Sequence, residues 1–336
     1  MQMEKEIVDI SIVIPLLNEE DNLHQLHQEI TDTLKGPLSD KSYEIIFVDD
    51  GSRDASFEIL KKISAGDSCV RVIRFRRNFG QTAAMSAGFE HARGHVIIPM
   101  DADLQNDPAD IPMLLKRLDD GFDIVSGWRR NRQDKAITRR LPSQIANYII
   151  RRITFVNIHD FGCTLKAYRR EVLQETKLYG EMHRFIPAVA TWSGARVTEL
   201  EVNHRARVAG KAKYGLARTY KVVLDLITVK FLGSYSTKPL YVFGKMGFFS
   251  AILSFLLFIV VVYQKIAADF SMNRNPLLVL AAMMFTASIQ FIMMGLLAEL
   301  LVRTYHESQN RPTYVIKEII EGTNTDEDTA SDKTGA

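Results

Sequence analysis

Two long stretches without a charged residue constrain this chain more than any other feature of its sequence. Residues 246–264 and 275–298 consist mainly of Leu, Ile, Val, Phe, Ala and Met. A helix of about 20 apolar residues crosses a bilayer, and soluble domains of this size rarely hold helices that are apolar on every side. We therefore predict two membrane-spanning helices, with two buried helices of a soluble core as the alternative. Gln290 lies within the second stretch, and we expect it to make a polar contact between helices.

Basic residues precede the first apolar stretch and follow the second. Because lysine and arginine favour the cytoplasmic side of a membrane, we predict that both termini and the long segment before residue 246 are cytoplasmic. The protein is expected to be multi-pass, and the bacterial inner membrane is favoured. Residues 1–9 lack the apolar run of a signal peptide, which agrees with this topology. The flanking residues are Lys230, Lys238 and Lys245 before the first stretch and Arg303, Arg311 and Lys317 after the second.

The composition is that of a folded protein with a large core. Of the 336 residues 46% are hydrophobic, and the formal net charge of +2 indicates no nucleic-acid partner. The two cysteines match neither a zinc site nor a disulfide framework. We predict a cytoplasmic globular domain over 1–210, an amphipathic juxtamembrane segment over 211–238, a two-helix membrane region over 239–303 and a cytoplasmic tail over 304–336. Beyond Glu318 the tail is acidic and rich in small residues, so we expect its end to be disordered.

The segment before residue 210 alternates short β-branched runs with segments of helical length. Between the first two runs, apolar residues recur at helical spacing, as at Leu23, Leu26 and Ile30. Such alternation predicts an α/β fold with a mostly parallel, Rossmann-like sheet. Ligands of these sheets bind at the carboxyl ends of the strands, so the residues just after each run form the candidate site. The runs that predict strands are 10–14, 43–48, 70–75, 95–99 and 122–126.

The fourth run is followed by two acids that are separated by one residue. Asp101 and Asp103 should project to the same side of an extended segment, and Gln105 adds a further oxygen. Hard oxygen ligands of this kind suit Mg²⁺ or Mn²⁺, and a cation that also binds a diphosphate needs few protein ligands. Asp107 and Pro108 then predict the start of a helix. The pattern favours a metal-assisted nucleotide site, with an ordinary pair of surface acids as the alternative.

Other strand ends carry residues that are suited to a nucleotide. Asp49 can accept a hydrogen bond from a base or a ribose. Ser52 could serve the same ligand or cap the next helix, and Asn18 after the first run leaves the same two alternatives open. Arg77 precedes Gly80 at a predicted helix start, where it could face phosphate or belong to a solvated basic turn.

Four motifs follow one another in order along this segment. They are Ile14-Pro15-x-x-Asn18-Glu19, Val48-Asp49-Asp50-Gly51-Ser52-x-Asp54, Arg77-Asn78-x-Gly80 and Asp101-Ala102-Asp103-Leu104-Gln105. Together they resemble the family 2 inverting glycosyltransferases, which have the GT-A fold. Within that family the chain resembles the polyprenyl-phosphate branch, which includes bactoprenol glucosyltransferases, aminoarabinose-transferring enzymes and dolichol-phosphate mannose synthases. The resemblance extends over about residues 8–305.

The resemblance implies roles for individual residues on the donor side. Asp101, Asp103 and Gln105 would hold the metal, and Asp103 counts among the catalytic residues through that metal. Asp160 would lie near the sugar, either as a base or as a residue that positions a sugar hydroxyl. The nucleotide would contact Pro15, Leu17, Glu19, Asp49, Asp50, Arg77 and Asp101.

Arginines further along the chain could clamp an acceptor phosphate, because a guanidinium offers paired donors. The mannose synthases have a similar set after the corresponding strand, and the resemblance transfers it to Arg129, Arg139 and Ser143. Arg205 and Lys211 lie in a second basic cluster and are candidates for the same phosphate. General attraction to anionic lipid heads is the alternative for this cluster.

The expected reaction is inverting transfer of a sugar to a polyisoprenyl phosphate at the cytoplasmic face of the membrane. UDP-glucose is the favoured donor and undecaprenyl phosphate the favoured acceptor, with a UDP-aminoarabinose derivative and GDP-mannose as alternative donors. A processive polysaccharide synthase is a weaker interpretation, since the sequence has no Gln-x-x-Arg-Trp motif and few spans. The intact acid pair argues against a non-catalytic membrane scaffold. We also expect a homo-oligomer.

Overall fold

The computed structural model describes residues 7–130, 147–148, 150–152, 154, 156–174, 182–205, 240–268, 271–308 and 314–323. These residues belong to two compact units. The first unit holds the described residues up to 205 together with 314–323, and the second holds those from 240 to 308. The chain therefore leaves the first unit, passes through the second and returns to the first. The predicted amphipathic segment 211–238 lies outside the described residues.

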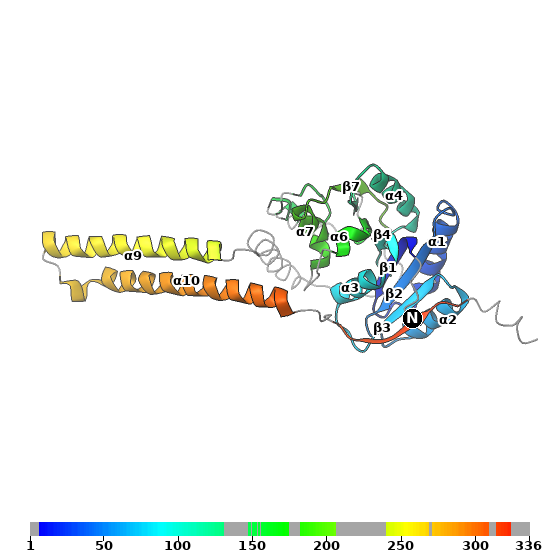
Figure 1. Ribbon diagram of the computed structural model, residues 1–336, viewed down its shortest axis with the longest axis horizontal. Helices are drawn as coiled ribbons and strands as arrows, with labels where there is room; N and C mark the ends of the chain where they lie inside the picture. Colours follow the sequence, from blue (N-terminus) through cyan, green and yellow to red (C-terminus); the bar gives the residue numbers. More distant parts are fainter. Residues whose placement is uncertain are drawn as a thin grey trace, which may run out of the picture. The chain divides into compact units, whose positions relative to one another are not determined.

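The described part of the first unit is built on an eight-stranded sheet with the order β7-β5-β6-β4-β1-β2-β3-β8 (Figure 1). β1 pairs in parallel with β2 and β4, β2 pairs in parallel with β3, and β5 with β7. β6 and β8 pair antiparallel with their neighbours. The predicted α/β fold with a mostly parallel sheet is confirmed. The strands are β1 (Val8–Leu16), β2 (Tyr43–Asp49), β3 (Val70–Phe75), β4 (Gly94–Pro99), β5 (Ile124–Trp128), β6 (Lys166–Arg169), β7 (Val197–Glu201) and β8 (Ile316–Glu321).

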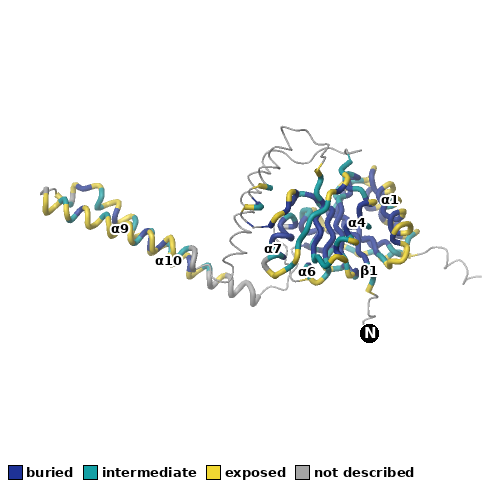
Figure 2. The backbone as a smooth tube through the Cα atoms, turned by 90° about the horizontal axis from the view of Figure 1, so that it is seen from above, coloured by how far each residue is buried: buried dark blue, intermediate teal, exposed yellow. Residues whose placement is uncertain are grey.

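Helices cover both faces of this sheet. One face forms the main hydrophobic core with α1 (Leu23–Lys35), α2 (Ser56–Gly66) and α4 (Ile111–Asp119). The other face packs against α3 (Gln81–His91), whose Gly88 lies against Val13 of β1. The central strands are the most deeply buried part of the unit and are dark blue in Figure 2. The shorter helices are η1 (Pro108–Asp110), α6 (Arg170–Gln174), η3 (Met182–Phe185) and α7 (Ile186–Trp192).

The sequence pattern does not predict β6, β7 or β8. β6 is short, and β7 reads Val-Thr-Glu-Leu-Glu, so neither shows a β-branched run. The expectation of disorder beyond Glu318 is wrong for the residues that complete β8, because this strand pairs with β3. Its acidic side chains meet arginines of the sheet, Glu318 with Arg74 and Glu321 with Arg71. Acidic composition there reflects cross-strand ion pairs rather than a lack of structure.

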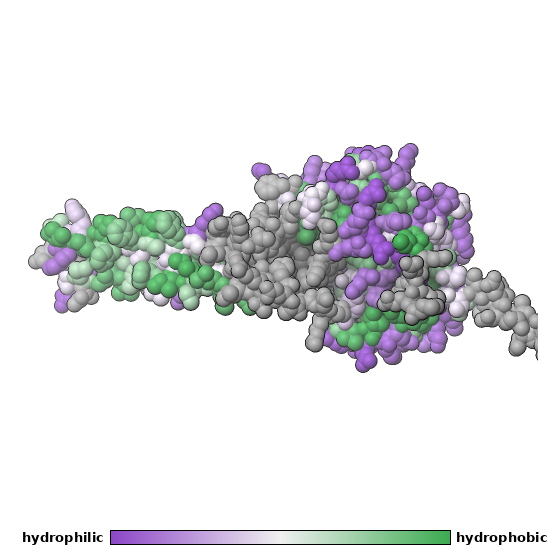
Figure 3. All heavy atoms as spheres, viewed as in Figure 1, coloured by the Kyte–Doolittle hydropathy of each residue, from purple (hydrophilic) through white to green (hydrophobic). Residues whose placement is uncertain are grey.

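The second unit is an antiparallel pair of helices, α9 (Leu240–Ala268) and α10 (Pro276–Ser308), joined through η4 (Met272–Arg274). Within the described residues, Phe243–Ala267 and Pro276–Ala298 are long and apolar enough to cross a membrane. Only 22% and 11% of the residues in their most apolar parts are buried, which is unlike the core helices of a soluble domain. Figure 3 shows the apolar surface that these helices expose. The two helices therefore have the character of membrane spans.

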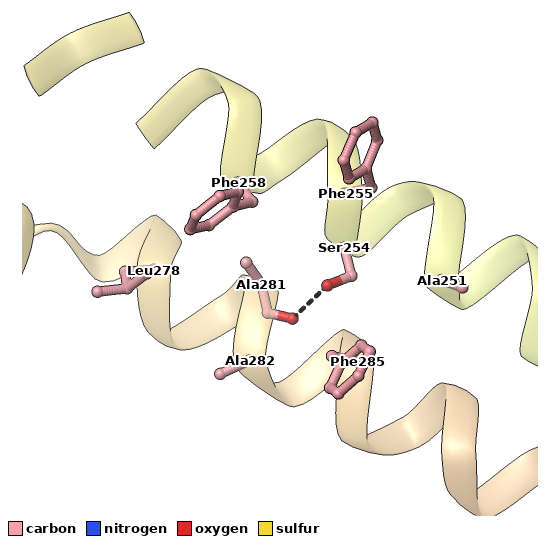
Figure 4. A pocket seen from close by; sticks show the side chains of 8 residues that line it. All are labelled: Ala251, Ser254, Phe255, Phe258, Leu278, Ala281, Ala282 and Phe285. Atoms are coloured by element: carbon pink, nitrogen blue, oxygen red, sulfur yellow. Dashed lines mark hydrogen bonds between the residues drawn. The ribbon is translucent and has the colours of Figure 1, made fainter. Parts of the chain in front are cut away.

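Polar contacts between the two helices come from residues other than Gln290. Ser254 Oγ donates to the carbonyl oxygen of Ala281 at 2.7 Å, and Asn275 Nδ2 donates to Gln264 Oε1 at 2.7 Å. The side chain of Gln290 is exposed on α10, so the structure does not bear out the predicted contact between the two spans. Small residues near Ser254 leave a pocket of about 430 Å³ between the helices (Figure 4). It is lined by Ala251, Ser254, Phe255, Phe258, Leu278, Ala281, Ala282 and Phe285.

Gly88→Ala should destabilise the first unit, because a Cβ at this position would lie 2.2 Å from Cγ1 of Val13. Overpacking of a tight core costs about 1–3 kcal/mol. Thermal unfolding of the detergent-solubilised full chain should show a lower midpoint for Gly88→Ala than for the wild type. Val13→Ala should lower the midpoint less in the Gly88→Ala background than in the wild type. Gly66→Ala is the control, since nothing lies within 4 Å of a Cβ there. Equal shifts for the two alanine variants would contradict the packing of α3 on β1.

Candidate functional site

The loops that follow β1 to β4 meet at one edge of the sheet. The parallel registers pair Leu16 with Asp49 and Asp49 with Arg74, while Val13 pairs with Pro99 near the end of β4. Because these strands run in the same direction, their carboxyl ends lie together, as the sequence predicts. Polar side chains from separate loops therefore contact one another at this edge.

Asp101 follows β4 and is held by two neutral donors from other elements. Gln81 Nε2, at the first residue of α3, donates to Asp101 Oδ1 at 2.8 Å. Thr164 Oγ1, in the segment before β6, donates to Asp101 Oδ2 at 2.6 Å. Neutral donors orient the carboxylate without cancelling its charge, and each oxygen keeps acceptor capacity for a further ligand.

Asp103 lies on a strained turn directly after Asp101. Leu104 has a φ of 60°, a left-handed conformation that a bulky side chain rarely adopts. Asp103 Oδ1 accepts the N–H of Gln105 at 3.2 Å, and Asn106 Oδ1 accepts the N–H of Asp101 at 3.3 Å. These bonds hold a backbone conformation that would otherwise be unfavourable, and the turn brings the two carboxylates close enough to interact.

The electrostatics of this acid pair suit a divalent cation. Burial, and then repulsion by Asp103, raise the pKa of Asp101 to about 6. A cation bound by both carboxylates would relieve that repulsion. The described residues contain no group of three or more His, Cys, Asp or Glu side chains that could hold a metal. A cation held by Asp101 and Asp103 would complete its coordination with other oxygens, such as those of a diphosphate.

Reciprocal hydrogen bonds join the loop after β1 to the loop after β2. Ser52 Oγ accepts the N–H of Asn18 at 2.9 Å, and Asn18 Oδ1 accepts the N–H of Arg53 at 2.8 Å. Ser56 Oγ accepts the N–H of Glu19 at 2.9 Å. The side chains for which the sequence left a choice between cap and ligand thus hold the two loops together.

Both acids after β2 are bonded within the protein. Asp50 Oδ1 accepts the N–H of Phe79 at 2.7 Å, and its Oδ2 accepts the N–H of Gly80 at 2.9 Å. Burial raises the pKa of Asp50, although these two donors oppose the shift. Asp49 is fully buried, and its Oδ1 accepts the N–H of Ser52 at 2.8 Å. Asp50 anchors the turn after β3 and Asp49 the turn after β2, so contact of either acid with a nucleotide stays a prediction.

The remaining predicted nucleotide residues differ in how accessible they are. Arg77 is exposed, with its guanidinium 4.1 Å from the centre of the Phe79 ring. Glu19 Oε2 accepts a hydrogen bond from Asn22 Nδ2 at 2.8 Å. Pro15 is buried within β1, whereas Leu17 is half-buried in the loop that follows. The structure brings these residues to the same edge of the sheet, with Arg77 the most open to a ligand.

Arg129 follows β5 directly and forms a two-point ion pair with Asp160. Arg129 Nε donates to Asp160 Oδ2 at 2.7 Å, and Nη2 donates to Oδ1 at 3.1 Å. Asp160 Oδ1 also accepts the N–H of Gly162 at 3.1 Å. Burial opposes the charge of the guanidinium, but Asp160 more than offsets this and raises the pKa of Arg129. A carboxylate held in this way is better suited to position a substrate than to take a proton.

The segment between Asp160 and Lys166 connects this ion pair to the acid pair. Lys166 opens β6 and is buried, and its Nζ donates to the carbonyl oxygen of Phe161 at 3.3 Å and to that of Cys163. Burial lowers the pKa of Lys166. The same segment carries Thr164, which bonds to Asp101. One short stretch therefore orients both a candidate metal ligand and Arg129.

The structure gives Arg205 two carboxylate partners. Arg205 Nη1 lies 2.6 Å from Glu29 Oε2 of α1, and Nη2 lies 2.7 Å from Asp107 Oδ1. Its N–H donates to the carbonyl oxygen of Gln105 at 3.0 Å. An acceptor phosphate would have to compete with these acids, and the assignment of Arg205 to that phosphate remains a prediction. The other acceptor candidates, Arg139, Ser143 and Lys211, lie outside the described residues.

Sequence reasoning missed Thr164 and Asn106, and it placed Gln81 among the candidate residues after the third run without giving it a role. Each contacts Asp101, yet Gln81 and Thr164 are 20 and 63 positions away along the chain. A usable signal exists only for Gln81, which follows Gly80 at a helix start next to a strand end. Thr164 reaches the site because β6 pairs antiparallel with β4, a pairing that the sequence pattern does not reveal.

Relatives of this chain share most of its length. A protein-family model described as "Glycosyl transferase family 2" matches residues 11–177. The chain is 39% identical over 318 residues to the dodecaprenyl-phosphate galacturonate synthase of Rhizobium johnstonii, covering 94% of each protein. It is 38% identical over 316 residues to the undecaprenyl-phosphate 4-deoxy-4-formamido-L-arabinose transferase of Salmonella choleraesuis, again covering 94% of each.

Solved structures support the fold alone. The chain superimposes on glucosyl-3-phosphoglycerate synthase from Mycobacterium tuberculosis, crystallised with Mn²⁺, UDP and phosphoglyceric acid, with a TM-score of 0.52 and 20% identity. The match covers 67% of this chain and 78% of that one. A complex of the same synthase with Mn²⁺, UDP and glucosyl-3-phosphoglycerate gives a TM-score of 0.50 at 19% identity.

Lowering the pH through about 6 should weaken binding of a divalent cation, because the Asp101 carboxyl takes up a proton in that range. The protonated acid is a poorer ligand, so the apparent Kd for Mn²⁺ should rise by up to about tenfold for each pH unit below 6 and stay level above 7. Calorimetric titration of the full chain with Mn²⁺ in the presence of a UDP-sugar measures this, because a diphosphate esterified at both ends takes up no proton near pH 6.

Asp107→Asn is the control for this titration, since Asp107 caps η1 instead of facing Asp101. The variant should keep the wild-type pH profile. A level affinity from pH 5 to 8 in the wild type would contradict the raised pKa of Asp101.

Proposed function

Because the chain belongs to glycosyl transferase family 2, and within it to the polyprenyl-phosphate glycosyltransferases, we propose that it transfers a sugar from a UDP-sugar to undecaprenyl phosphate with inversion at the anomeric carbon. The observation that carries this proposal is the oriented acid pair, Asp101 and Asp103, at the edge where the loops after four parallel strands meet. Two apolar helices in the same chain favour an acceptor that resides in a membrane.

On the donor side, Asp101 and Asp103 would hold Mg²⁺ or Mn²⁺, with Gln105 as a further oxygen nearby. Such a cation stabilises the negative charge that develops on a leaving diphosphate. Gln81 and Thr164 keep Asp101 in one orientation, so little rearrangement is needed during the reaction. Arg77 is exposed at the same edge and is available to a phosphate of the donor.

On the acceptor side, a strong base is not required. A phosphate monoester has a second pKa near 6 and is mostly ionised at neutral pH, so its oxygen can attack without losing a proton in that step. The Arg129–Asp160 pair supports a positioning role for Asp160. Because a guanidinium has five N–H donors and this pair uses two, Arg129 can still donate to an acceptor phosphate.

The names of the two relatives support a proposal about which sugar the donor carries. The two relatives are named for galacturonate and for 4-deoxy-4-formamido-L-arabinose. Removal of the carboxyl carbon from D-galacturonate leaves an L-arabinose ring, so both sugars carry the same configuration at C4, which is opposite to that of glucose. We therefore place a UDP-sugar with the C4 configuration of galactose, such as UDP-galacturonate or a UDP-aminoarabinose derivative, ahead of the UDP-glucose that the sequence resemblance favours.

A panel of labelled donors tests the reaction and the sugar together. Purified full chain, undecaprenyl phosphate and Mn²⁺ are incubated with UDP-galacturonate, UDP-glucuronate, UDP-galactose, UDP-glucose, a UDP-aminoarabinose derivative or GDP-mannose, and lipid-soluble label is counted. We expect each galacto sugar to exceed its C4 epimer by at least tenfold. If none of the donors gives lipid-soluble label, the proposed reaction is refuted. If UDP-glucuronate and UDP-glucose are preferred to their C4 epimers, the sugar assignment is refuted.

Asp103→Asn should lower transfer by at least about a hundredfold, because it removes one charge from the proposed cation site. The fold should survive, since an Asn side-chain oxygen can still accept the N–H of Gln105. Turnover is measured at saturating Mn²⁺, with thermal unfolding as the check on structure. Asp119→Asn, at an exposed position at the end of α4, is the control and should keep near-normal turnover. Activity of Asp103→Asn within fivefold of wild type would contradict the assignment.

The membrane topology that we propose places the first unit and both termini in the cytoplasm. Support comes from β8, which follows α10 in the chain yet pairs with β3 of the first unit. A strand can rejoin that sheet only if α9 and α10 return the chain to the side from which it left. The lysines and arginines that flank the helices favour the cytoplasmic side. Homo-oligomer formation stays a prediction.

Cysteine labelling tests this topology. In a Cys69→Ser background, Asn273→Cys lies between the helices and should react with an impermeant maleimide added to intact cells. Thr323→Cys, just after β8, should react only after the membrane is permeabilised. Labelling of Thr323→Cys in intact cells would contradict the return of the chain to the cytoplasmic side.

A further inference from the structure

Three charged residues lie side by side in a row on the neighbouring strands β2, β3 and β8. The first is at the end of β2, where the proposed nucleotide site lies, and the last is on the strand that follows the membrane helices. Asp49 of β2 pairs in register with Arg74 of β3, and Arg74 with Glu318 of β8. Arg74 Nε lies 3.6 Å from Asp49 Oδ2, and Arg74 Nη1 lies 3.4 Å from Glu318 Oε1. Residues paired across strands share a face of the sheet, so one guanidinium connects both carboxylates.

Asp49 needs this arginine because its carboxylate is fully buried. Its Oδ1 accepts the N–H of Ser52, whereas no donor among the described residues hydrogen-bonds to Oδ2. A buried charge that lacks compensation is costly, and Arg74 is the cation paired with it. The ring of Phe57 lies 3.8 Å from the guanidinium carbon of Arg74. Arg74 is thus held by an aromatic ring of α2 and by Glu318.

We propose that Glu318 is a positioning residue for the nucleotide donor: it holds Arg74 against the buried Asp49 and so fixes the end of β2 and the turn after it, which line the proposed nucleoside pocket. This inference rests on the proposed function, because it takes the end of β2 as the nucleoside pocket. β8 comes after the membrane helices in the sequence. The donor pocket is therefore complete only once the chain has passed through the membrane and returned to the sheet.

The same strand supplies a matched control. Glu321 pairs with Arg71 at 2.8 Å and with Arg93 at 3.3 Å, and Arg71 also donates to the carbonyl oxygen of His91 at the end of α3. This cluster lies toward the amino-terminal end of β3 and on the face opposite to Asp49. The carboxylates of Glu318 and Glu321 are similarly exposed, at 41% and 53%. Glu321→Gln therefore removes an ion pair from β8 without touching the row that ends at Asp49.

The test compares nucleotide affinity and transfer in the detergent-solubilised full chain. UDP binding in the presence of Mn²⁺ is followed by calorimetry, and kcat and KM are measured for donor and lipid. Glu318→Gln should weaken UDP binding and raise the donor KM by about two- to fivefold, the range for a partly exposed ion pair, with kcat and the lipid KM unchanged. Glu321→Gln should leave all four values within error, although both variants lower the unfolding midpoint to a similar extent.

Arg74→Lys adds the second arm of the experiment. Lysine keeps the charge but not the fork that reaches two carboxylates, so we expect weaker UDP binding than in the wild type. If Glu318 acts through Arg74, Glu318→Gln should reduce the affinity for UDP less in the Arg74→Lys background than in the wild type.

Two results would overturn the inference. The first is an equal loss of UDP affinity in Glu318→Gln and Glu321→Gln, which would mean that β8 only stabilises the sheet. The second is an undiminished effect of Glu318→Gln in the Arg74→Lys background. If no donor in the panel supports transfer while UDP binding still depends on Glu318, the proposed reaction fails and the inference holds. If the wild type binds no nucleotide, both fail.

Discussion

Buried carboxylates at the carboxyl edge of a parallel sheet are the constraint on which the rest of this site depends. Parallel strands carry Asp49, Asp50 and Asp101 to one edge, where each charge needs compensation. The chain compensates them in different ways. Backbone N–H groups hold Asp50, an arginine approaches Asp49, and neutral side chains hold Asp101. Burial and the charge of Asp103 keep the pKa of Asp101 raised in spite of its two hydrogen bonds, so this acid suits a divalent cation.

The proposed acceptor side needs positive charge, whereas the proposed metal site needs negative charge. A lipid phosphate brings its own negative charge, so the protein must supply positive charge and orientation rather than a base. Arg129 is fixed by Asp160, and Asp160 is fixed by the turn that continues to Thr164. A single short segment between β5 and β6 therefore orients both a predicted metal ligand, Asp101, and the arginine proposed for the acceptor phosphate. A change in that segment would disturb the orientation of both residues.

The path of the chain links the membrane helices to the sheet. After α10 the chain adds β8 to the edge beside β3, and β8 carries Glu318 to Arg74. Edge strands are open to unwanted pairing, and β8 covers the edge of β3. If Glu318 positions Arg74 as proposed, the donor pocket also depends on residues that are added after the membrane segment. Membrane insertion and donor binding would then be coupled through the covalent order of the chain.

The sequence by itself determined the features that depend on local pattern. Five strands, the acid pair after the fourth, the helix start at Asp107–Pro108 and the two apolar helices can all be predicted from neighbouring residues, because periodicity and turn chemistry act over a few positions. Only the tertiary structure decided which residues meet across the sheet: Thr164 on Asp101, Arg129 on Asp160, and Glu318 on Arg74. These contacts depend on strand pairings between segments far apart in sequence, and such pairings are set by burial and register over the whole sheet rather than by any local run of residues.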